Sequence, residues 1–300
     1  MAWRGLHLTQ PARLSLKDGQ IVVGQDDGEV RLALEDLAWI VLDSPQTNLT
    51  TSLLSACMNA GIAVIVTDAT HIPSGLALPF HRHFRQGDIA WRQAEMSAPL
   101  KKRLWQTIVQ RKIDNQAAAL AVFGRDGAET LRGMARRVGS GDPDNVEARA
   151  ARFYWSRLWP DFRREDAGDR RNKLINYGYA VARSAVARSL VASGLLPSFG
   201  LMHASAVNAF NLADDFVEPF RPFVDLLAWQ TVGEGRACRE ELSVEDRRAM
   251  AAVPLREARM GGDSVSLLVA AERTSVSFLN AMESGSAAVL ELPAAPAPTP

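Results

Sequence analysis

The first part of the chain has the short runs of alternating hydrophobic and polar residues that are typical of β-strands. ARLSLKDGQIVVG (12–24) contains two such runs on either side of Asp18 and Gly19, a pair that favours a tight hairpin turn. Residues 28–44 add an alternating strand and a more continuously apolar one, and GIAVIVTDA (61–69) adds a further buried strand. We therefore predict a β-rich N-terminal domain over residues 1–75.

One helix interrupts this domain. Residues 48–60 place Leu53, Leu54, Cys57 and Met58 at helical spacing, and Thr50 or Thr51 can cap the helix. His7 is a lone histidine in a strand, which is more often structural than catalytic.

From about residue 88 the hydrophobic residues recur at the spacing of amphipathic helices. A segment with Pro and Gly, residues 76–87, is expected to link the two regions. We predict an α+β fold, in which a small β-rich N-terminal domain with one helix is followed by a larger all-α domain over residues 88–292. The last residues, PAAPAPTP (293–300), are of low complexity, so we expect them to be disordered and their removal to be harmless.

Charge is distributed unevenly although the formal net charge is zero. Residues 81–190 contain 22 Lys and Arg against 12 Asp and Glu, a net of +10, whereas both flanks are acidic. A basic middle suits a polyanion, although a solvated Arg-rich helical surface would give the same count. The two cysteines form no zinc or disulfide pattern, and we see no signal peptide or apolar run long enough for a bilayer. We expect a cytoplasmic protein without membrane contact.

Candidate chemistry is concentrated in residues 198–225, which contain His203 and three acids. Asp214, Asp215 and Glu218 would share one face of a helix, among Phe and Leu residues. Carboxylates in such a setting need a cationic partner, either a divalent metal ion or an arginine such as Arg221. Pro219 should bend or end the helix and disfavour an α conformation at Glu218.

A further acid, Glu147, follows the turn GDPDN. It can belong to a capping box with Asp144, or it can be a ligand. Nucleotide-binding glycine motifs and the GxSxG motif are absent from the sequence. Imidazole and carboxylate ligands suit Mg²⁺ or Mn²⁺, and beside a basic surface such a site would favour phosphodiester cleavage or transfer.

Three blocks together resemble the CRISPR-associated integrase of spacer acquisition, called CRISPR-associated protein one, in the form that accompanies type II systems. These blocks are GDPDNVEARAARFYW, NKLINYGYAVARS and HASAVNAFNLADDFVEPFRP. The order of a β-rich domain, a linker and a helical domain is also similar. The resemblance implies a divalent-metal-dependent endonuclease that joins the 3′-hydroxyl of short double-stranded DNA, the new spacer, to the CRISPR repeat by transesterification.

The resemblance also implies residue roles and partners. Glu147, His203 and Glu218 would hold Mg²⁺ or Mn²⁺ and be catalytic, and Asp215 could assist or replace Glu218, because many relatives have Asp where this chain has Glu. The family acts as homodimers bridged by CRISPR-associated protein two, and we place the homodimer contact in the N-terminal domain.

Two other functions stay open, a catalytically silent DNA-binding scaffold and a general nuclease of DNA junctions. In the scaffold, Glu147 would be a helix cap and the acidic cluster an ion-pair network. For each function the phosphates of DNA would meet basic residues. The candidates for this contact are Arg82, Arg85, Lys101, Lys102, Arg103 and Arg163.

Overall fold

The N-terminal region consists of two four-stranded sheets and one helix. This is a computed structural model, which describes residues 3–80, 83–233 and 238–296. One sheet has the order β1-β5-β7-β8 and the other β4-β3-β2-β6. The strands are β1 (Arg4–Leu8), β2 (Arg13–Lys17), β3 (Gln20–Gln25), β4 (Gly28–Ala33), β5 (Leu37–Leu42), β6 (Asn48–Leu49), β7 (Ala63–Thr67) and β8 (Pro73–Ala77).

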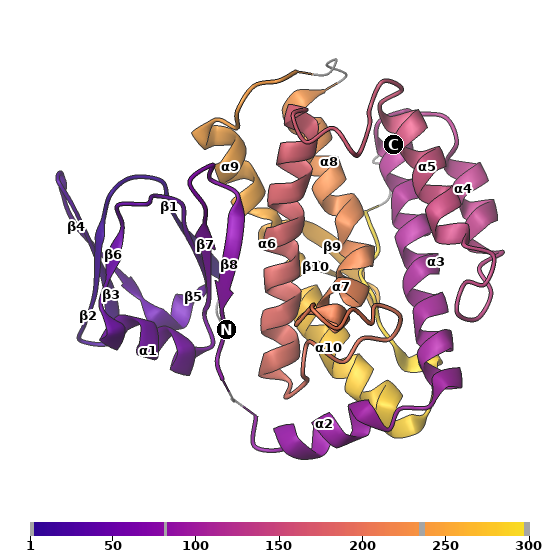
Figure 1. Ribbon diagram of the computed structural model, residues 1–300, viewed down its shortest axis with the longest axis horizontal. Coiled ribbons are helices and arrows are strands. Elements are labelled where there is room, and N and C mark those ends of the chain that lie inside the picture. Colours follow the sequence, from indigo (N-terminus) through magenta and orange to yellow (C-terminus); the bar gives the residue numbers. More distant parts are fainter. Residues whose placement is uncertain (1–2, 81–82, 234–237, 297–300) are drawn as a thin grey trace.

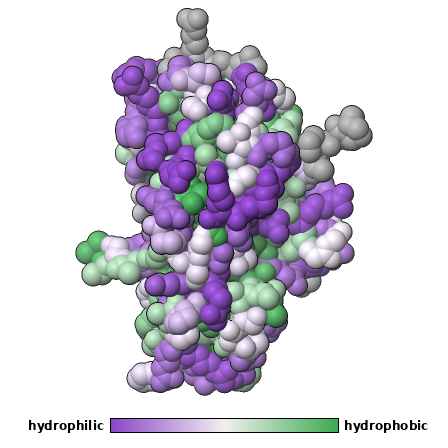
Figure 2. All heavy atoms as spheres, turned by 90° about the vertical axis from the view of Figure 1, so that its right-hand side faces the viewer, coloured by the Kyte–Doolittle hydropathy of each residue, from purple (hydrophilic) through white to green (hydrophobic). Residues whose placement is uncertain are grey.

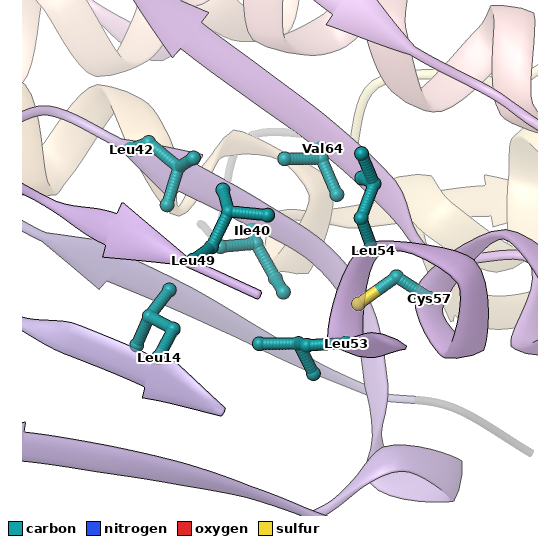
Figure 3. Close-up of a pocket in the computed structure, with 8 residues that line it drawn as sticks. All are labelled: Leu14, Ile40, Leu42, Leu49, Leu53, Leu54, Cys57 and Val64. Atoms are coloured by element: carbon teal, nitrogen blue, oxygen red, sulfur yellow. The ribbon is translucent and has the colours of Figure 1, made fainter. Parts of the chain in front are cut away.

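The local signals read from the sequence explain these elements. Asp18 and Gly19 both have positive φ, 51° and 73°, and join β2 to β3 in the hairpin that was expected. Helix α1 (Thr51–Ala60) begins after Thr50, whose side chain accepts a hydrogen bond from the Leu53 amide. Between the sheets and α1 lies a pocket that is lined by aliphatic side chains and the thiol of Cys57 (Figure 3), and burial raises the pKa of this thiol to about 11.

The other face of the first sheet packs against the helical region (Figure 1), and a buried carboxylate joins the two. Asp43 contacts His7 Nε2 at 2.9 Å, His71 Nδ1 at 2.9 Å and Arg247 Nε at 2.7 Å. Trp39 donates its indole hydrogen to the Ala251 carbonyl at 3.1 Å. His7 therefore has a structural role in joining the two regions, as predicted for a lone histidine in a strand.

The C-terminal region is mostly helical, with the long α3 and α6 at its centre (Figure 1). Its helices are α2 (Gln86–Ala94), α3 (Ala98–Val122), α4 (Ala128–Ala135), α5 (Val146–Leu158), α6 (Arg170–Ala192), α7 (Asn211–Val217), α8 (Arg221–Val232), α9 (Val244–Ala251) and α10 (Leu267–Ser284). A short 3₁₀ turn, η2 (Glu218–Phe220), connects α7 to α8. Ser243 and Asp246 form a capping box at the start of α9.

Three expectations about the domain organisation need correction. It is not all-α, because β9 (Glu257–Met260) and β10 (Asp263–Ser266) form an antiparallel hairpin around a Gly-Gly turn with positive φ. Strand β8 runs past residue 75 to pair with β7, since its backbone completes the sheet edge. Helix α2 begins at Gln86, inside the segment expected to be a linker.

The start of the C-terminal tail is ordered, contrary to expectation. Ala294 pairs with Arg259 of β9, and the buried Asn115 of α3 binds the tail through both ends of its amide. Asn115 Nδ2 donates to the Pro293 carbonyl at 2.9 Å, and the Ala295 amide donates to Asn115 Oδ1 at 2.9 Å. The tail satisfies a buried polar group, so Pro293–Ala295 cannot be treated as disordered. Residues 297–300 lie outside the described residues.

Truncation after Leu292 should therefore destabilise the protein, rather than be harmless. Asn115 would lose two hydrogen-bond partners while buried, which costs about 1–3 kcal/mol. Denaturant unfolding of the truncated chain should show this loss, and a chain truncated after Pro296 is the matched control. Equal stability of the two truncated chains would contradict the role given to Asn115.

Candidate active site

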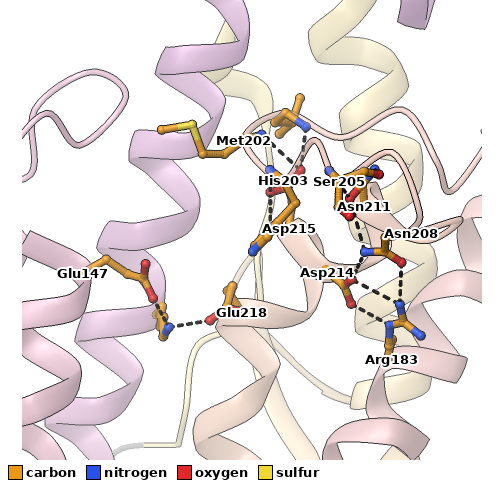
Figure 4. Close-up of polar contacts among 12 residues, drawn as sticks. Glu147, Arg183, Met202, His203, Ser205, Asn208, Asn211, Asp214, Asp215 and Glu218 are labelled. Carbon is orange, nitrogen blue, oxygen red and sulfur yellow. Dashed lines mark hydrogen bonds and ion pairs between the residues drawn. The ribbon is translucent and has the colours of Figure 1, made fainter. Parts of the chain in front are cut away.

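The site is built where α3, α5 and the η2 turn meet. Asp142 caps α5, because its carboxylate accepts hydrogen bonds from the Val146 amide at 2.8 Å and the Glu147 amide at 2.9 Å. The capping role considered for Asp144 and Glu147 therefore belongs to Asp142. The Glu147 side chain is left free to point towards α3 (Figure 4).

Lys112 of α3 lies between Glu147 and Glu218. Its ammonium donates a hydrogen bond to Glu147 Oε1, and it lies 2.5 Å from Glu218 Oε2. Lys112 and Glu218 are only 6% and 4% exposed. Burial lowers the pKa of Lys112, but the charges of Glu218 and Glu147 outweigh burial and leave this pKa raised. Lys112 is therefore a buried ammonium held by two carboxylates.

Glu218 is fixed by a second cation and by its backbone. Arg221 Nε lies 3.0 Å from Glu218 Oε1, so Arg221 is the cationic partner that the sequence suggested. Burial raises the pKa of Glu218, but the charges of Lys112 and Arg221 outweigh it and hold this pKa below its usual value. Asn115 Nδ2 also donates to the Pro219 carbonyl at 2.8 Å.

The backbone at Glu218 corrects one expectation. Helix α7 does end at Val217, as the following Pro219 predicts. Glu218 nevertheless has φ −54° and ψ −47°, in the helical region that a following proline disfavours. The contacts of Glu218 with Lys112 and Arg221 offset that preference.

Asp215 holds the loop that carries His203. Its Oδ1 accepts from His203 Nδ1 at 2.8 Å and from the His203 amide at 3.1 Å. Its Oδ2 accepts from the Leu201 amide at 2.5 Å and the Met202 amide at 3.3 Å. Asp215 is fully buried and its two oxygens are occupied by this loop, while the His203 side chain is 44% exposed.

The same loop is anchored one helical turn earlier. Asn211 of α7 accepts from the Ser205 amide at 3.2 Å and donates to the Ser205 carbonyl at 3.0 Å. Gly200 lets the backbone at residue 200 lie close to the backbone at His203, because a Cβ at Gly200 would lie 2.1 Å from the His203 carbonyl oxygen. The hydrogen bond that His203 donates to the Asp215 carboxylate raises the pKa of His203, although burial opposes it.

The three acids of α7 and η2 do not converge. Asp214 pairs with Arg183, whose Nε lies 2.5 Å from Asp214 Oδ1, while Asp215 binds the loop and Glu218 binds Lys112. The shared face predicted from spacing is thus divided among three partners (Figure 4).

The arrangement partly fits a divalent metal ion. Among the described residues no three His, Cys, Asp or Glu side chains lie close enough together to hold one. The ammonium of Lys112, however, stands where Glu147 and Glu218 meet, so two carboxylates converge on a positive charge. His203 has the orientation common among metal-binding histidines, with one ring nitrogen bound to a carboxylate and Nε2 left for a ligand. The donor set suits Mg²⁺ or Mn²⁺.

Sequence reasoning missed Lys112, Asp142 and Asn115. Lys112 is the hardest to detect, because a lysine among other basic residues of a helix is usually solvated. Asn115 follows it by three residues and Trp105 precedes it by seven, so all three share the inward face of α3. The rings of Trp105 and His203 pack edge to face, with their centroids 5.8 Å apart.

The basic residues expected to contact DNA are spread over several elements. Lys101, Lys102 and Arg103 lie in the first turns of α3, Arg163 is exposed in the loop before α6, and Arg85 precedes α2 and pairs with Asp88 at 2.8 Å. Arg82 lies outside the described residues. The face on the α3, α4 and α5 side is mostly hydrophilic (Figure 2).

Comparison with known proteins shows the family. The family model for CRISPR associated protein Cas1 matches residues 6–257. The chain is 42% identical to the CRISPR-associated endonuclease Cas1 of Neisseria meningitidis serogroup C (strain 8013), over 79% of this chain and 78% of that protein. It is 27% identical to the CRISPR-associated endonuclease Cas1 2 of Saccharolobus solfataricus, over 75% of this chain and 73% of that protein.

Solved structures agree on the fold. A casposase bound to its integration product superimposes with a TM-score of 0.77 at 16% identity, covering 95% of this chain and 92% of the casposase chain. A CAS1 protein from Thermotoga maritima gives a TM-score of 0.70 at 18% identity, covering 93% and 97% of the two chains. At these identities the likeness concerns the fold alone.

The family match and the curated relatives place the chain in the class of CRISPR-associated proteins. The chain belongs to the Cas1 family, as its resemblance to CRISPR-associated protein one implied. In the described part of the chain, no helix has the length and apolar character that a membrane span requires.

A buried carboxylate behind the site gives a pH-dependent prediction. Tyr179 donates to Asp225 Oδ1 at 2.6 Å, and its ring lies 4.8 Å from the guanidinium of Arg221. Burial raises the pKa of Asp225 to about 7, and the hydrogen bond from Tyr179 offsets burial only in part. From the ordinary value near 3.8 up to about pH 7, the folded chain therefore holds one more proton than the unfolded chain.

Asp225→Asn should become progressively more stable than the unsubstituted chain as the pH rises from 4 to 8. The free energy of unfolding of the unsubstituted chain loses the contribution of this proton over that range, whereas asparagine does not titrate. Unfolding midpoints measured at both pH values test this, with the exposed Asp126→Asn as control. A difference between Asp225→Asn and the unsubstituted chain that does not change with pH would contradict the assignment.

Proposed function

We propose that the chain is a metal-dependent DNA integrase and endonuclease of CRISPR adaptation, which joins the 3′-hydroxyl of a short DNA duplex to a phosphodiester of the CRISPR repeat. The observation that supports this most is the pair of carboxylates, Glu147 and Glu218, that converge on one positive charge beside His203. Three separate segments supply these groups, and Asp142, Asn115 and Asp215 hold them in place.

Glu147, Glu218 and His203 Nε2 would hold Mg²⁺ or Mn²⁺, and the bound ion would stabilise negative charge on the attacked phosphate and assist the attacking hydroxyl. Asp215 fits a positioning role better than that of a ligand, because both of its oxygens already accept hydrogen bonds from the His203 loop. Arg221 keeps Glu218 ionised and oriented from the side opposite Lys112.

DNA and a small partner protein are part of the proposal. The casposase relative is bound to its integration product, and another structural neighbour is a Cas6-RT-Cas1–Cas2 complex with a TM-score of 0.74. We infer double-stranded DNA, a homodimer formed through the N-terminal domain, and a Cas2 partner. Phosphate contacts are assigned to the basic candidates, which are Arg82, Arg85, Lys101, Lys102, Arg103 and Arg163.

The scaffold function has one observation in its favour. Lys112 and Arg221 already neutralise Glu147 and Glu218, which is what an ion-pair network without metal requires. A general junction nuclease differs from both, because it would cut branched DNA with no partner and no CRISPR repeat.

Strand transfer separates these functions. We expect a labelled DNA duplex to be joined to a repeat-bearing plasmid with Mn²⁺ and the Cas2 partner, and the joints to vanish with chelator. His203→Ala should lower the yield of joints at least ~100-fold, as is usual when a group that positions the reacting atoms is lost. Because the His203 side chain is about half exposed, its removal should leave the fold intact, and unfolding measurements on the variant check this.

Three outcomes are distinguishable. Joints that need metal, partner and His203 support the integrase. Tight DNA binding without joints under any metal supports the scaffold, and cleavage of branched DNA without partner or repeat supports the junction nuclease. Val276→Ala, at an exposed position of α10 outside the domain assigned to the dimer contact, is the control that should leave joining unaffected.

A further inference from the structure

Lys112 has a position that the proposed integrase site leaves unexplained. It is a buried ammonium at the point where two proposed metal ligands meet, on a helix whose other basic residues in its first turns are largely exposed. An ammonium carries one charge and donates hydrogen bonds, so it can replace a divalent ion between two carboxylates without coordinating them.

Charge at this point is balanced without a metal ion. Lys112 and Arg221 carry two positive charges, and Glu147 and Glu218 carry two negative ones. A divalent ion added to this group would leave a net charge of about +2 beside a buried lysine, which is unfavourable unless the ammonium moves or a polyanion arrives. The carboxylates can serve Lys112 or a divalent ion, and not both at once in the same geometry.

We propose that Lys112 is a built-in competitor of the divalent ion, which holds Glu147 and Glu218 together in the metal-free protein and must leave them before the ion can bind. This inference rests on the proposed function, since it assumes that the two carboxylates are ligands. Lys112 is here a positioning residue. It keeps two like charges in place for the ion, and the cost is a lower affinity for that ion.

The displaced ammonium remains beside the site, because it is fixed to the middle of α3. A phosphate of bound DNA would accept hydrogen bonds from this ammonium, and its negative charge would restore the charge balance. DNA and metal should therefore favour each other's binding, by reciprocal amounts. Without DNA, the affinity for metal is reduced by the fraction of molecules in which Lys112 has left the carboxylates.

The test is a Mn²⁺ titration of the full-length chain without DNA, followed by the loss of the free-ion signal in electron paramagnetic resonance. Lys112→Met should bind Mn²⁺ roughly 10- to 100-fold more tightly than the unsubstituted chain, because every molecule is then free of the competitor. In chelator the same variant should unfold at a lower temperature, and Mn²⁺ should restore more than this loss. Lys112→Gln, which keeps the hydrogen-bond donors without the charge, serves if Lys112→Met does not fold.

Two controls separate displacement from a general charge effect. Arg221→Gln removes a positive charge that pairs with Glu218 and lies against the Tyr179 ring, rather than between the two carboxylates, so it should tighten Mn²⁺ binding much less than Lys112→Met does. Lys17→Met removes an exposed lysine of β2 and should change nothing. Equal tightening by the Arg221 and Lys112 variants, or no tightening by either Lys112 variant, overturns the inference.

The same titration distinguishes failure of the inference from failure of the proposed function. Suppose that Glu147→Gln abolishes Mn²⁺ binding and that the Lys112 variants leave it unchanged. This result would overturn the inference that Lys112 competes with the ion and would retain the metal site. Absence of Mn²⁺ binding in the unsubstituted chain and in both Lys112 variants would overturn both. Binding that only the Lys112 variants show would be the strongest support, because the ammonium alone would then block the site.

Discussion

Two carboxylates facing each other in a mostly buried place constrain the whole helical region. Glu147 and Glu218 would repel each other, and the desolvation of Glu218 alone is costly, so a cation must lie between them. The chain supplies that cation from α3, and the helices are then fixed relative to one another by the pairing. The Asp142 cap and the Asn115 amide help to keep the two carboxylates in place. Asp142 holds the backbone at Glu147, and Asn115 holds the backbone next to Glu218.

Local chemistry of the sequence predicted the elements well. Asp18 and Gly19 form a hairpin, and Thr50 caps α1 as expected, because such signals act within a few residues. The β9–β10 hairpin was missed because its strands are short and its Gly-Gly turn follows a helical pattern. The ordered tail was missed for another reason. Low complexity describes its composition, whereas its order comes from Asn115, which lies about 180 residues earlier in the chain.

Only part of the site could be predicted from the sequence, and there is a physical reason why the rest could not. Glu147, His203 and Glu218 lie in motifs that identify them by resemblance, and the structure brings two of them onto one cation. Their partners come from distant segments, so spacing could not assign them. Asp214, Asp215 and Glu218 are near neighbours in sequence, yet each contacts a different segment, because three acids on one turn are most stable when their charges are neutralised separately.

The amide of Asn115 has a consequence for how the protein is made. It binds the Pro219 carbonyl next to Glu218 and also the backbone of Pro293 and Ala295, which are among the last residues of this chain. During synthesis the segments that carry Lys112, Glu147 and Glu218 leave the ribosome well before that tail does, and the N-terminal part of a chain generally folds first. Asn115 can complete its contacts only when the C-terminal residues have emerged. The turn that carries Glu218 should thus reach its final rigidity only after residues 293–295 have been synthesised and have reached Asn115.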